Sequence, residues 1–170
     1  MEGAISSFDT EIVGRAQVVM RLMLERKLSA VTAESCTAGL IAAALSEAEG
    51  AGEGLHGGFV TYTKEQKTIA LGVPTDLLAS RGSVNDEVAR LMAKGALERS
   101  PADLALAVTG VLGPEPDEDG NPVGLVYLAC GKRGQMPTVV ERRFPPMETD
   151  RLRHVVVIAA FDLIEATVCN

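Results

Sequence analysis

Apolar residues recur at helical spacing in several segments of the chain. This spacing predicts helices over residues 9–27, 37–47, 64–71 and 85–99, and a last helix that begins at Asp150. Asn85 suits the start of the fourth helix, because its short side chain can accept a hydrogen bond from the first turn. We therefore expect five helices, distributed along the length of the chain.

Short apolar runs between these helices predict strands. They cover residues 28–33, 59–63, 104–108, 123–130 and 138–144. Every residue of 104–108 is apolar, which is typical of a strand buried on both faces of a parallel sheet. The last two runs lie close together in the chain and favour an antiparallel hairpin. Residues 48–58 contain five glycines, so we expect a flexible loop there.

The alternation of helices and strands, followed by one hairpin, predicts an α/β fold. The expected architecture is a three-layer α/β/α sandwich on a mixed, mostly parallel sheet. A chain of 170 residues with 46% apolar residues can build one continuous core, so we expect a single domain over residues 1–170.

The charge balance and hydropathy exclude several classes of partner. Acidic residues outnumber basic ones 23 to 16, and the net charge of -7 argues against binding of nucleic acid. No apolar run reaches the roughly 18 residues that a membrane span needs, and the N-terminus lacks the basic start of a signal peptide. We expect a cytoplasmic protein with neither a nucleic-acid nor a membrane partner.

Cysteine and histidine are scarce. Cys36, Cys130 and Cys169 are widely spaced and odd in number, which predicts neither disulfides nor a structural metal site. The only histidines are His56 and His154, so a nucleophile would have little choice of imidazole base.

The segment from Ala33 to Gly39 is the first candidate for chemistry. It reads Ala-Glu-Ser-Cys-Thr-Ala-Gly and lies where a predicted strand ends and a predicted helix begins, at the edge where open α/β sheets bind ligands. A helix N-terminus there would stabilise an oxyanion beside Ser35, Cys36 and Thr37. Ser35 or Thr37 as a simple helix cap, and Cys36 as either a nucleophile or a small buried residue, are alternatives that the pattern leaves open.

The second candidate segment follows the strand predicted over residues 59–63. Because histidine is scarce, a lysine neutralised by burial is the natural base for Ser35, and a nearby Tyr62 hydroxyl could hold the proton. Nothing local distinguishes Lys64 from Lys67 in that role. Solvated lysines and a packed tyrosine are the alternative interpretation.

The third candidate segment, residues 109–114, follows the buried strand and reads Thr-Gly-Val-Leu-Gly-Pro. Gly110 would allow a ligand to approach the backbone. The acidic residues at 115–119 lack the ligand spacing of a calcium loop and predict a solvated loop. Four arginines could offset this acidity beside an anionic substrate, although surfaces commonly carry such charges: Arg142, Arg143, Arg151 and Arg153.

Together these segments resemble the CinA C-terminal domain family, which includes nicotinamide-nucleotide amidases. The family pattern Glu-Ser-Cys-Thr-Gly-Gly is similar to residues 34–39, and Gly-Phe-Val-Thr-Tyr followed by a lysine five residues later is similar to residues 58–67. The pattern Thr-Gly-x-x-Gly-Pro is similar to residues 109–114, and a Pro-Val-Gly strand opening to residues 122–124. The resemblance covers nearly the whole chain.

The resemblance implies a function and a site. It implies hydrolysis of nicotinamide mononucleotide, a step of pyridine nucleotide salvage, to nicotinate mononucleotide and ammonia through an acyl-enzyme, with no metal or cofactor. Ser35 matches the nucleophile, Lys67 the base and Tyr62 the nearby tyrosine. The expected substrate-binding residues are Cys36, Thr37, Gly39, Thr109, Gly110 and Arg151.

The resemblance also implies an assembly. Family members commonly form homodimers or larger homo-oligomers, and the expected partner besides a second copy is a small-molecule nucleotide. Many members carry an N-terminal domain related to molybdopterin-binding proteins, for which we expect no room in this chain.

The chain departs from the family pattern at three positions. Ala38 replaces a glycine, Leu112 replaces a usual alanine, and Val155 replaces a second arginine. We expect Ala38 and Leu112 to narrow the pocket, and the acidic loop before Pro122 to weaken phosphate binding. These departures motivate an alternative hypothesis, in which the chain is a catalytically silent nucleotide-binding or assembly module.

Overall fold

A five-stranded mixed sheet forms the middle layer of the protein in a computed structural model that describes residues 9–170. The strands, in the order β2-β1-β3-β4-β5 across the sheet, are β2 (Leu55–Val60), β1 (Ala30–Glu34), β3 (Leu104–Gly110), β4 (Leu125–Lys132) and β5 (Thr138–Arg143). β1 runs parallel to both β2 and β3, whereas β3, β4 and β5 pair antiparallel. The predicted hairpin of the last two strands is therefore confirmed.

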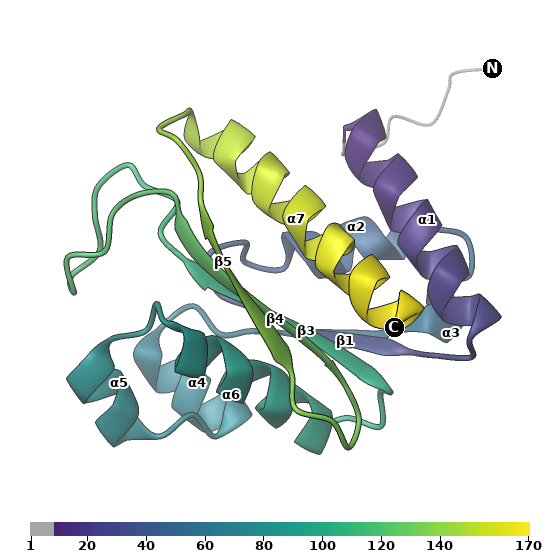
Figure 1. The fold of residues 1–170 in the computed structure, drawn as a ribbon, viewed down its shortest axis with the longest axis horizontal. Coiled ribbons are helices and arrows are strands. Elements are labelled where there is room, and N and C mark those ends of the chain that lie inside the picture. Colours follow the sequence, from purple (N-terminus) through teal and green to yellow (C-terminus); the bar gives the residue numbers. More distant parts are fainter. Residues whose placement is uncertain (1–8) are drawn as a thin grey trace.

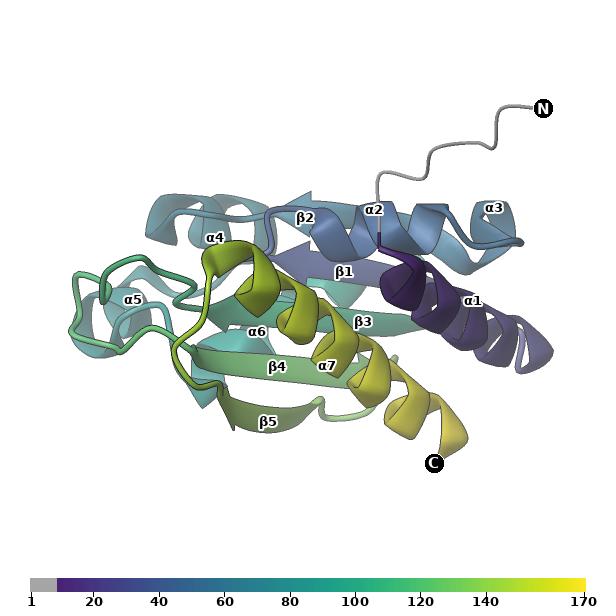
Figure 2. The ribbon, with the colours of Figure 1, turned by 90° about the horizontal axis from the view of Figure 1, so that it is seen from above.

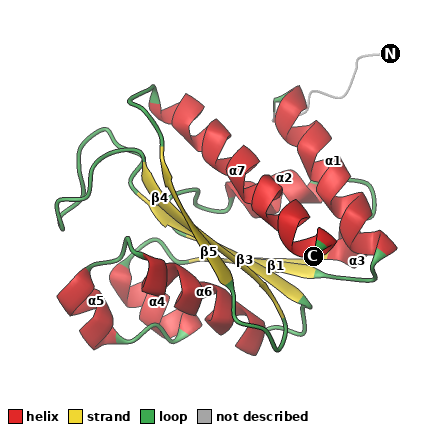
Figure 3. Cartoon of the chain, in the orientation of Figure 1, coloured by secondary structure: helices red, strands yellow, loops and turns green. Residues whose placement is uncertain are grey.

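Helices cover both faces of the sheet (Figure 1, Figure 3). On one face lie α1 (Thr10–Glu25), α2 (Leu40–Ser46), α3 (Ala51–Gly54) and α7 (Thr149–Cys169). On the other lie α4 (Lys64–Leu71), α5 (Thr75–Arg81) and α6 (Asp86–Glu98). The three-layer α/β/α architecture predicted from the sequence is confirmed. None of the helices in residues 9–170 is both long and apolar enough to cross a membrane.

Two apolar layers hold the helices on the sheet, and β3 contributes to both. Leu104, Leu106 and Val108 pack into the layer under α1 and α7, whereas Ala105 and Ala107 pack into the layer under α6. This alternation follows from the period of two in a strand. The continuous apolar run of β3 is thus explained by helices on both of its faces.

Several element boundaries differ from the predictions. Residues 48–58 were expected to be a flexible loop, but residues 51–58 form α3 and the first four residues of β2. Gly58 is needed there for close packing, because a Cβ atom at this position would lie 2.5 Å from Thr32 Oγ1 and 3.2 Å from Ala42 Cβ. The helix expected to begin at residue 37 begins at Leu40, and α5 was not predicted.

The chain connections create a crevice at the carboxyl ends of the parallel strands. The β1-to-β2 connection runs through α2 and α3 on one face, and the β2-to-β3 connection runs through α4, α5 and α6 on the other (Figure 2). Neighbouring parallel strands whose connections leave on opposite faces form a crevice at their carboxyl ends, where open α/β sheets bind ligands. Ser35 follows β1 and Val111 follows β3 at this edge.

Candidate active site

Ser35 and Lys67 meet at this crevice although they are far apart in the sequence. Lys67 Nζ lies 2.9 Å from Ser35 Oγ in a buried hydrogen bond. Ser35 is 7% exposed and Lys67 1% exposed. The two residues follow adjacent parallel strands, Ser35 directly after β1 and Lys67 on α4, which begins shortly after β2. Thr63 caps α4 by accepting a hydrogen bond from Gln66 N.

Lys67 loses its proton more easily than an exposed lysine does. Burial, with a smaller contribution from the positive charge of Lys64, lowers the pKa of Lys67 from 10.5 to about 8. Its Nζ also donates to the carbonyl oxygens of Thr61 at 2.8 Å and Tyr62 at 3.4 Å. A neutral amine has two N–H donors and one lone pair. The two carbonyls can take both donors and leave the lone pair for the Ser35 hydroxyl proton.

Glu34 holds the segment that carries Ser35. Its side chain, on a residue only 1% exposed, accepts hydrogen bonds from Thr37 Oγ1 at 2.6 Å, from the N–H groups of Gly39 and Ile41 at 3.0 Å each, and from Ala42 N at 2.8 Å. No role for Glu34 was predicted from the sequence. The available signal was an acidic residue at the end of a strand whose other residues are small or apolar.

The turn after Ser35 corrects the expectation of a helix N-terminus at this point. Ala38 and Gly39 have φ values of 51° and 96°, and α2 begins only at Leu40. The N–H groups of its first turn are occupied: Ile41 and Ala42 donate to the Glu34 side chain and Leu40 donates to the Thr37 carbonyl, so none is left for a ligand beside Ser35. The Thr37 hydroxyl and the Gly39 N–H, on residues that the resemblance assigned to substrate binding, donate to the Glu34 side chain.

Two backbone N–H groups of this turn are available to donate hydrogen bonds to a ligand. Those of Cys36 and Thr37 have no oxygen acceptor within residues 9–170 and lie close to the Cys36 sulfur, a weak acceptor. Burial raises the pKa of the Cys36 thiol to about 12. Because the thiolate is the reactive form, this environment disfavours Cys36 as the nucleophile.

An open hollow exposes this segment to solvent. Its lining residues come from the ends of β1, β2 and β3 and from neighbouring segments: Ser35, Cys36, Tyr62, Ser83, Val84, Thr109, Gly110, Val111, Leu112, Gly113, Glu115, Asp117 and Arg153. The structure thus gathers four of the sequence-predicted site residues, besides Ser35, around one hollow: Cys36, Tyr62, Thr109 and Gly110. Leu112, expected to narrow the pocket, lines the hollow, whereas Ala38 does not.

Tyr62 lines the hollow with a side chain that points largely into solvent. The residue is 69% exposed, and its hydroxyl makes no hydrogen bond to Ser35 or Lys67. Its backbone carbonyl accepts from Lys67. The structure therefore brings together the hydroxyl of Ser35 and the amine of Lys67, but not the phenol of Tyr62.

Thr109 and Gly110 form the wall contributed by β3. Thr109 Oγ1 donates to the Ser83 carbonyl at 2.8 Å and so ties β3 to the segment before α6. A Cβ atom at Gly110 would lie 2.7 Å from Val126 Cγ2 and 2.8 Å from the Leu125 carbonyl oxygen. The packing of β4 therefore already requires glycine at residue 110, whether or not a ligand approaches it.

Lys64 lies at the surface and pairs with the acidic loop. Its Nζ lies 2.7 Å from Glu118 Oε1 and 3.0 Å from Asp119 Oδ2. Lys67, on the same helix, faces Ser35. The structure thereby distinguishes the two lysines that the local sequence left equivalent.

Arg151 lies apart from the hollow beside Ser35. It lines a separate hollow together with Glu11, Asp150 and His154. Arg153, two residues later on α7, lines the hollow of Ser35 instead. Residues two apart on a helix point in directions about 200° apart, so one helix cannot turn both arginines toward the same hollow.

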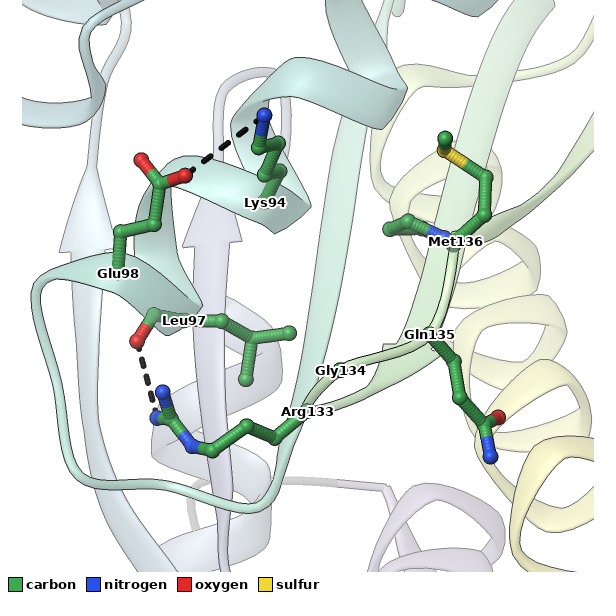
Figure 4. Close-up of a pocket in the computed structure, with 8 residues that line it drawn as sticks. Lys94, Leu97, Glu98, Arg133, Gly134, Gln135 and Met136 are labelled. Atoms are coloured by element: carbon green, nitrogen blue, oxygen red, sulfur yellow. Dashed lines mark hydrogen bonds and ion pairs between the residues drawn. The ribbon is translucent and has the colours of Figure 1, made fainter.

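Two further groups of polar residues lie outside this site. Figure 4 shows a hollow between α6 and the turn after β4, where Lys94 pairs with Glu98 and the Arg133 guanidinium donates to the Leu97 carbonyl. Within residues 9–170, one group of three potential metal ligands lies close together, formed by Asp9, Glu11 and His154. Neither group includes a residue that lines the hollow of Ser35.

The fold and the site define a class of protein: a three-layer α/β/α domain with a buried serine–lysine pair at the carboxyl ends of its parallel strands. A family model described as the CinA C-terminal domain matches residues 14–168. The chain belongs to this family.

Curated relatives support the assignment. The chain is 46% identical over 144 residues to a CinA-like protein of Geobacter sulfurreducens, with 85% of this chain and 34% of the relative covered. It is 47% identical over 119 residues to a putative competence-damage inducible protein of Symbiobacterium thermophilum, with 70% of this chain and 28% of the relative covered. The chain thus spans about a third of the length of these relatives.

Solved structures share the fold over nearly the whole chain. The competence/damage inducible protein CihA from Agrobacterium tumefaciens superposes with a TM-score of 0.90 at 39% identity, covering 96% of this chain and 99% of that one. The competence damage-inducible protein A (ComA) from Klebsiella pneumoniae superposes with a TM-score of 0.89 at 31% identity, covering 94% and 98%.

Proposed function

We propose that the protein is an amidase that hydrolyses nicotinamide mononucleotide to nicotinate mononucleotide and ammonia. The observation that carries this proposal is the buried Lys67 amine, with a pKa of about 8, hydrogen-bonded to Ser35 at 2.9 Å. A hydroxyl beside a desolvated amine is suited to attack on a carboxamide carbon. The substrate itself is suggested by the resemblance of the motifs to nicotinamide-nucleotide amidases.

In the first half of the proposed reaction, neutral Lys67 takes the hydroxyl proton as Ser35 Oγ bonds to the carboxamide carbon. The carbonyl oxygen becomes an oxyanion, for which the N–H groups of Cys36 and Thr37 are the available donors. Protonated Lys67 then gives its proton to the leaving nitrogen as the carbon–nitrogen bond breaks. Ammonia departs and leaves an ester on Ser35.

In the second half, water attacks the ester. Lys67, neutral again, takes a proton from the water as its oxygen bonds to the carbonyl carbon. Collapse of this intermediate breaks the bond to Ser35 Oγ, which recovers its proton from Lys67. The product is the carboxylic acid of the substrate, and no metal or cofactor takes part in this scheme.

The other groups have supporting roles in this proposal. Tyr62 contributes its carbonyl to Lys67 and lines the hollow, as do Thr109 and Gly110. We further propose a cytoplasmic homodimer or larger homo-oligomer that acts on a small-molecule nucleotide and binds no nucleic acid or membrane. The net charge of -7 supports the exclusion of nucleic acid.

Product analysis tests the proposal. Purified protein incubated with nicotinamide mononucleotide should release ammonia and nicotinate mononucleotide in equal amounts, and Ser35→Ala should release neither. Tyr62→Phe, measured in parallel, should retain most of the activity if only the carbonyl and ring of Tyr62 contribute. Saturable binding of the nucleotide without product, across a pH series, would favour the alternative of a catalytically silent binding module.

A further inference from the structure

We propose that Arg153 recognises the phosphate of the substrate and sets a preference for a phosphorylated amide over its nucleoside. This inference rests on the proposed function, because it assigns a substrate class to the same site. The family resemblance placed Arg151, not Arg153, among the substrate-binding residues.

The position of Arg153 is the first argument. It shares the hollow with Ser35, whereas Arg151 lines a different hollow with Glu11 and His154. Of the described residues that line the hollow of Ser35, Arg153 is the only cationic one. An anionic group bound in the hollow therefore has Arg153 as the one cationic side chain among the described residues that line it.

The free donors of Arg153 are the second argument. One nitrogen, Nη1, lies 3.0 Å from Asp150 Oδ1, and the Asp150 side chain is 96% exposed. An exposed pair of this kind contributes at most about 1 kcal/mol, so a phosphate can displace it. A guanidinium carries five N–H donors in a planar fork that matches phosphate oxygens in a bidentate pair.

The acidic residues of the hollow sharpen the assignment. Glu115 and Asp117 lie on the loop after β3 and repel a phosphate on their side of the hollow. Asp117 already accepts hydrogen bonds from Asp119 N, Asn121 N and Asn121 Nδ2. Nicotinamide mononucleotide carries a cationic pyridinium ring and an anionic phosphate. Its charges match those of the hollow when the phosphate lies near Arg153 and the ring lies nearer the acidic residues.

The test compares nicotinamide mononucleotide with nicotinamide riboside, which lacks the phosphate. In wild type, kcat/KM should favour the mononucleotide, and Arg153→Met should reduce this preference about tenfold, mainly by raising KM for the mononucleotide. Methionine keeps an apolar stem and removes the positive charge together with the N–H donors. Arg21→Met, on α1 and outside the hollow, is the control for the loss of one positive charge.

Two results would overturn the inference. One is a preference unchanged by Arg153→Met, and the other is a preference that falls in Arg151→Met but not in Arg153→Met. Calorimetric titration of both ligands into wild type and Arg153→Met separates this inference from the proposed function. Tight binding of the mononucleotide that depends on Arg153, without release of ammonia, would reject the amidase and retain the phosphate site. Ammonia release that does not depend on Arg153 would reject only the phosphate site.

Discussion

Lys67 Nζ and Ser35 Oγ lie 2.9 Å apart, on residues that are both almost fully buried. A lysine in this position is costly for the fold as a cation and useful for chemistry as an amine. Its titration therefore links the stability of the domain to its proposed activity.

We expect kcat/KM to rise with pH to a plateau, with a midpoint near 8, because the pKa of Lys67 is lowered to about 8 and only the neutral amine can accept the Ser35 proton. In Lys67→Arg, kcat/KM should fall at least about a thousandfold, since arginine does not deprotonate. A pH–rate profile of ammonia release measures both effects. A flat profile from mildly acidic to alkaline pH would contradict a lysine base.

Lys64→Met serves as a matched control for this profile. The positive charge of Lys64 lowers the pKa of Lys67, so its removal should move the midpoint to higher pH. The plateau should change little, because Lys64 faces the acidic loop rather than Ser35. A loss of the plateau as large as that of Lys67→Arg would instead assign the base to Lys64.

Stability should depend on pH through the same group. The pKa of Lys67 is about 8 in the folded protein and 10.5 unperturbed, so between these values the unfolded chain binds more protons and stability rises with pH. Below pH 8 the folded protein buries the protonated side chain of Lys67, and this lowers the free energy of unfolding by about 3 kcal/mol. Relative to Lys67→Met, wild type should gain about 1 kcal/mol in the free energy of unfolding from about pH 7 to about pH 9.

Urea unfolding of both proteins at several pH values measures this difference. Taking the difference between the two proteins cancels the titration of the buried thiols, which both retain. Parallel pH dependence of wild type and Lys67→Met would show that Lys67 is not desolvated in the folded protein.

Glu34 should matter for both stability and turnover. Glu34→Gln keeps the side-chain volume but places an amide N–H₂ against N–H donors, so we expect a loss of about 2–4 kcal/mol in the free energy of unfolding. In the folded fraction, kcat should fall more than KM rises, because the Ser35 turn is displaced. Thr37→Val removes a single donor to Glu34, so its loss in the free energy of unfolding should be smaller than that of Glu34→Gln. A loss below about 1 kcal/mol in Glu34→Gln would contradict this role.

Cys36 should not be the nucleophile. Because burial raises the pKa of its thiol to about 12, iodoacetamide at neutral pH should modify the exposed Cys169 well before Cys36. Cys36→Ala should lower kcat/KM by less than about tenfold, because the backbone N–H at residue 36 remains. Peptide mapping and ammonia release check the two statements. Inactivation by Cys36→Ala as complete as by Ser35→Ala would reverse the assignment.

The fold followed from patterns that act locally. Asp9 and Asn85 cap α1 and α6 through their side chains as their residue types suggest, and the apolar run of β3 indicated its burial. The prediction of a loop at residues 48–58 was wrong, because Gly54 and Gly58 serve close packing against Met20 of α1 and Thr32 of β1 rather than flexibility. Composition alone does not separate these two uses of glycine.

The site was predictable in its residues but not in its geometry. The local sequence indicated Ser35 and a lysine on α4, and the family resemblance selected Lys67. The pairing of β1 with β2 explains why Lys67 rather than Lys64 reaches Ser35. The exposure of Tyr62 and the choice between Arg151 and Arg153 also depend on tertiary direction. Spacing along one helix separates Arg151 from Arg153, but it specifies neither which of the two faces Ser35 nor how far Tyr62 is exposed.

Mass spectrometry of protein quenched with acid during turnover of nicotinamide mononucleotide tests the central claim most directly. We predict a covalent adduct with the mass of the substrate minus ammonia, mapped to the peptide that contains Ser35 and absent from Ser35→Ala and Lys67→Met. Turnover that persists in Ser35→Ala, with no adduct on that peptide in wild type, would contradict nucleophilic catalysis by the serine–lysine pair.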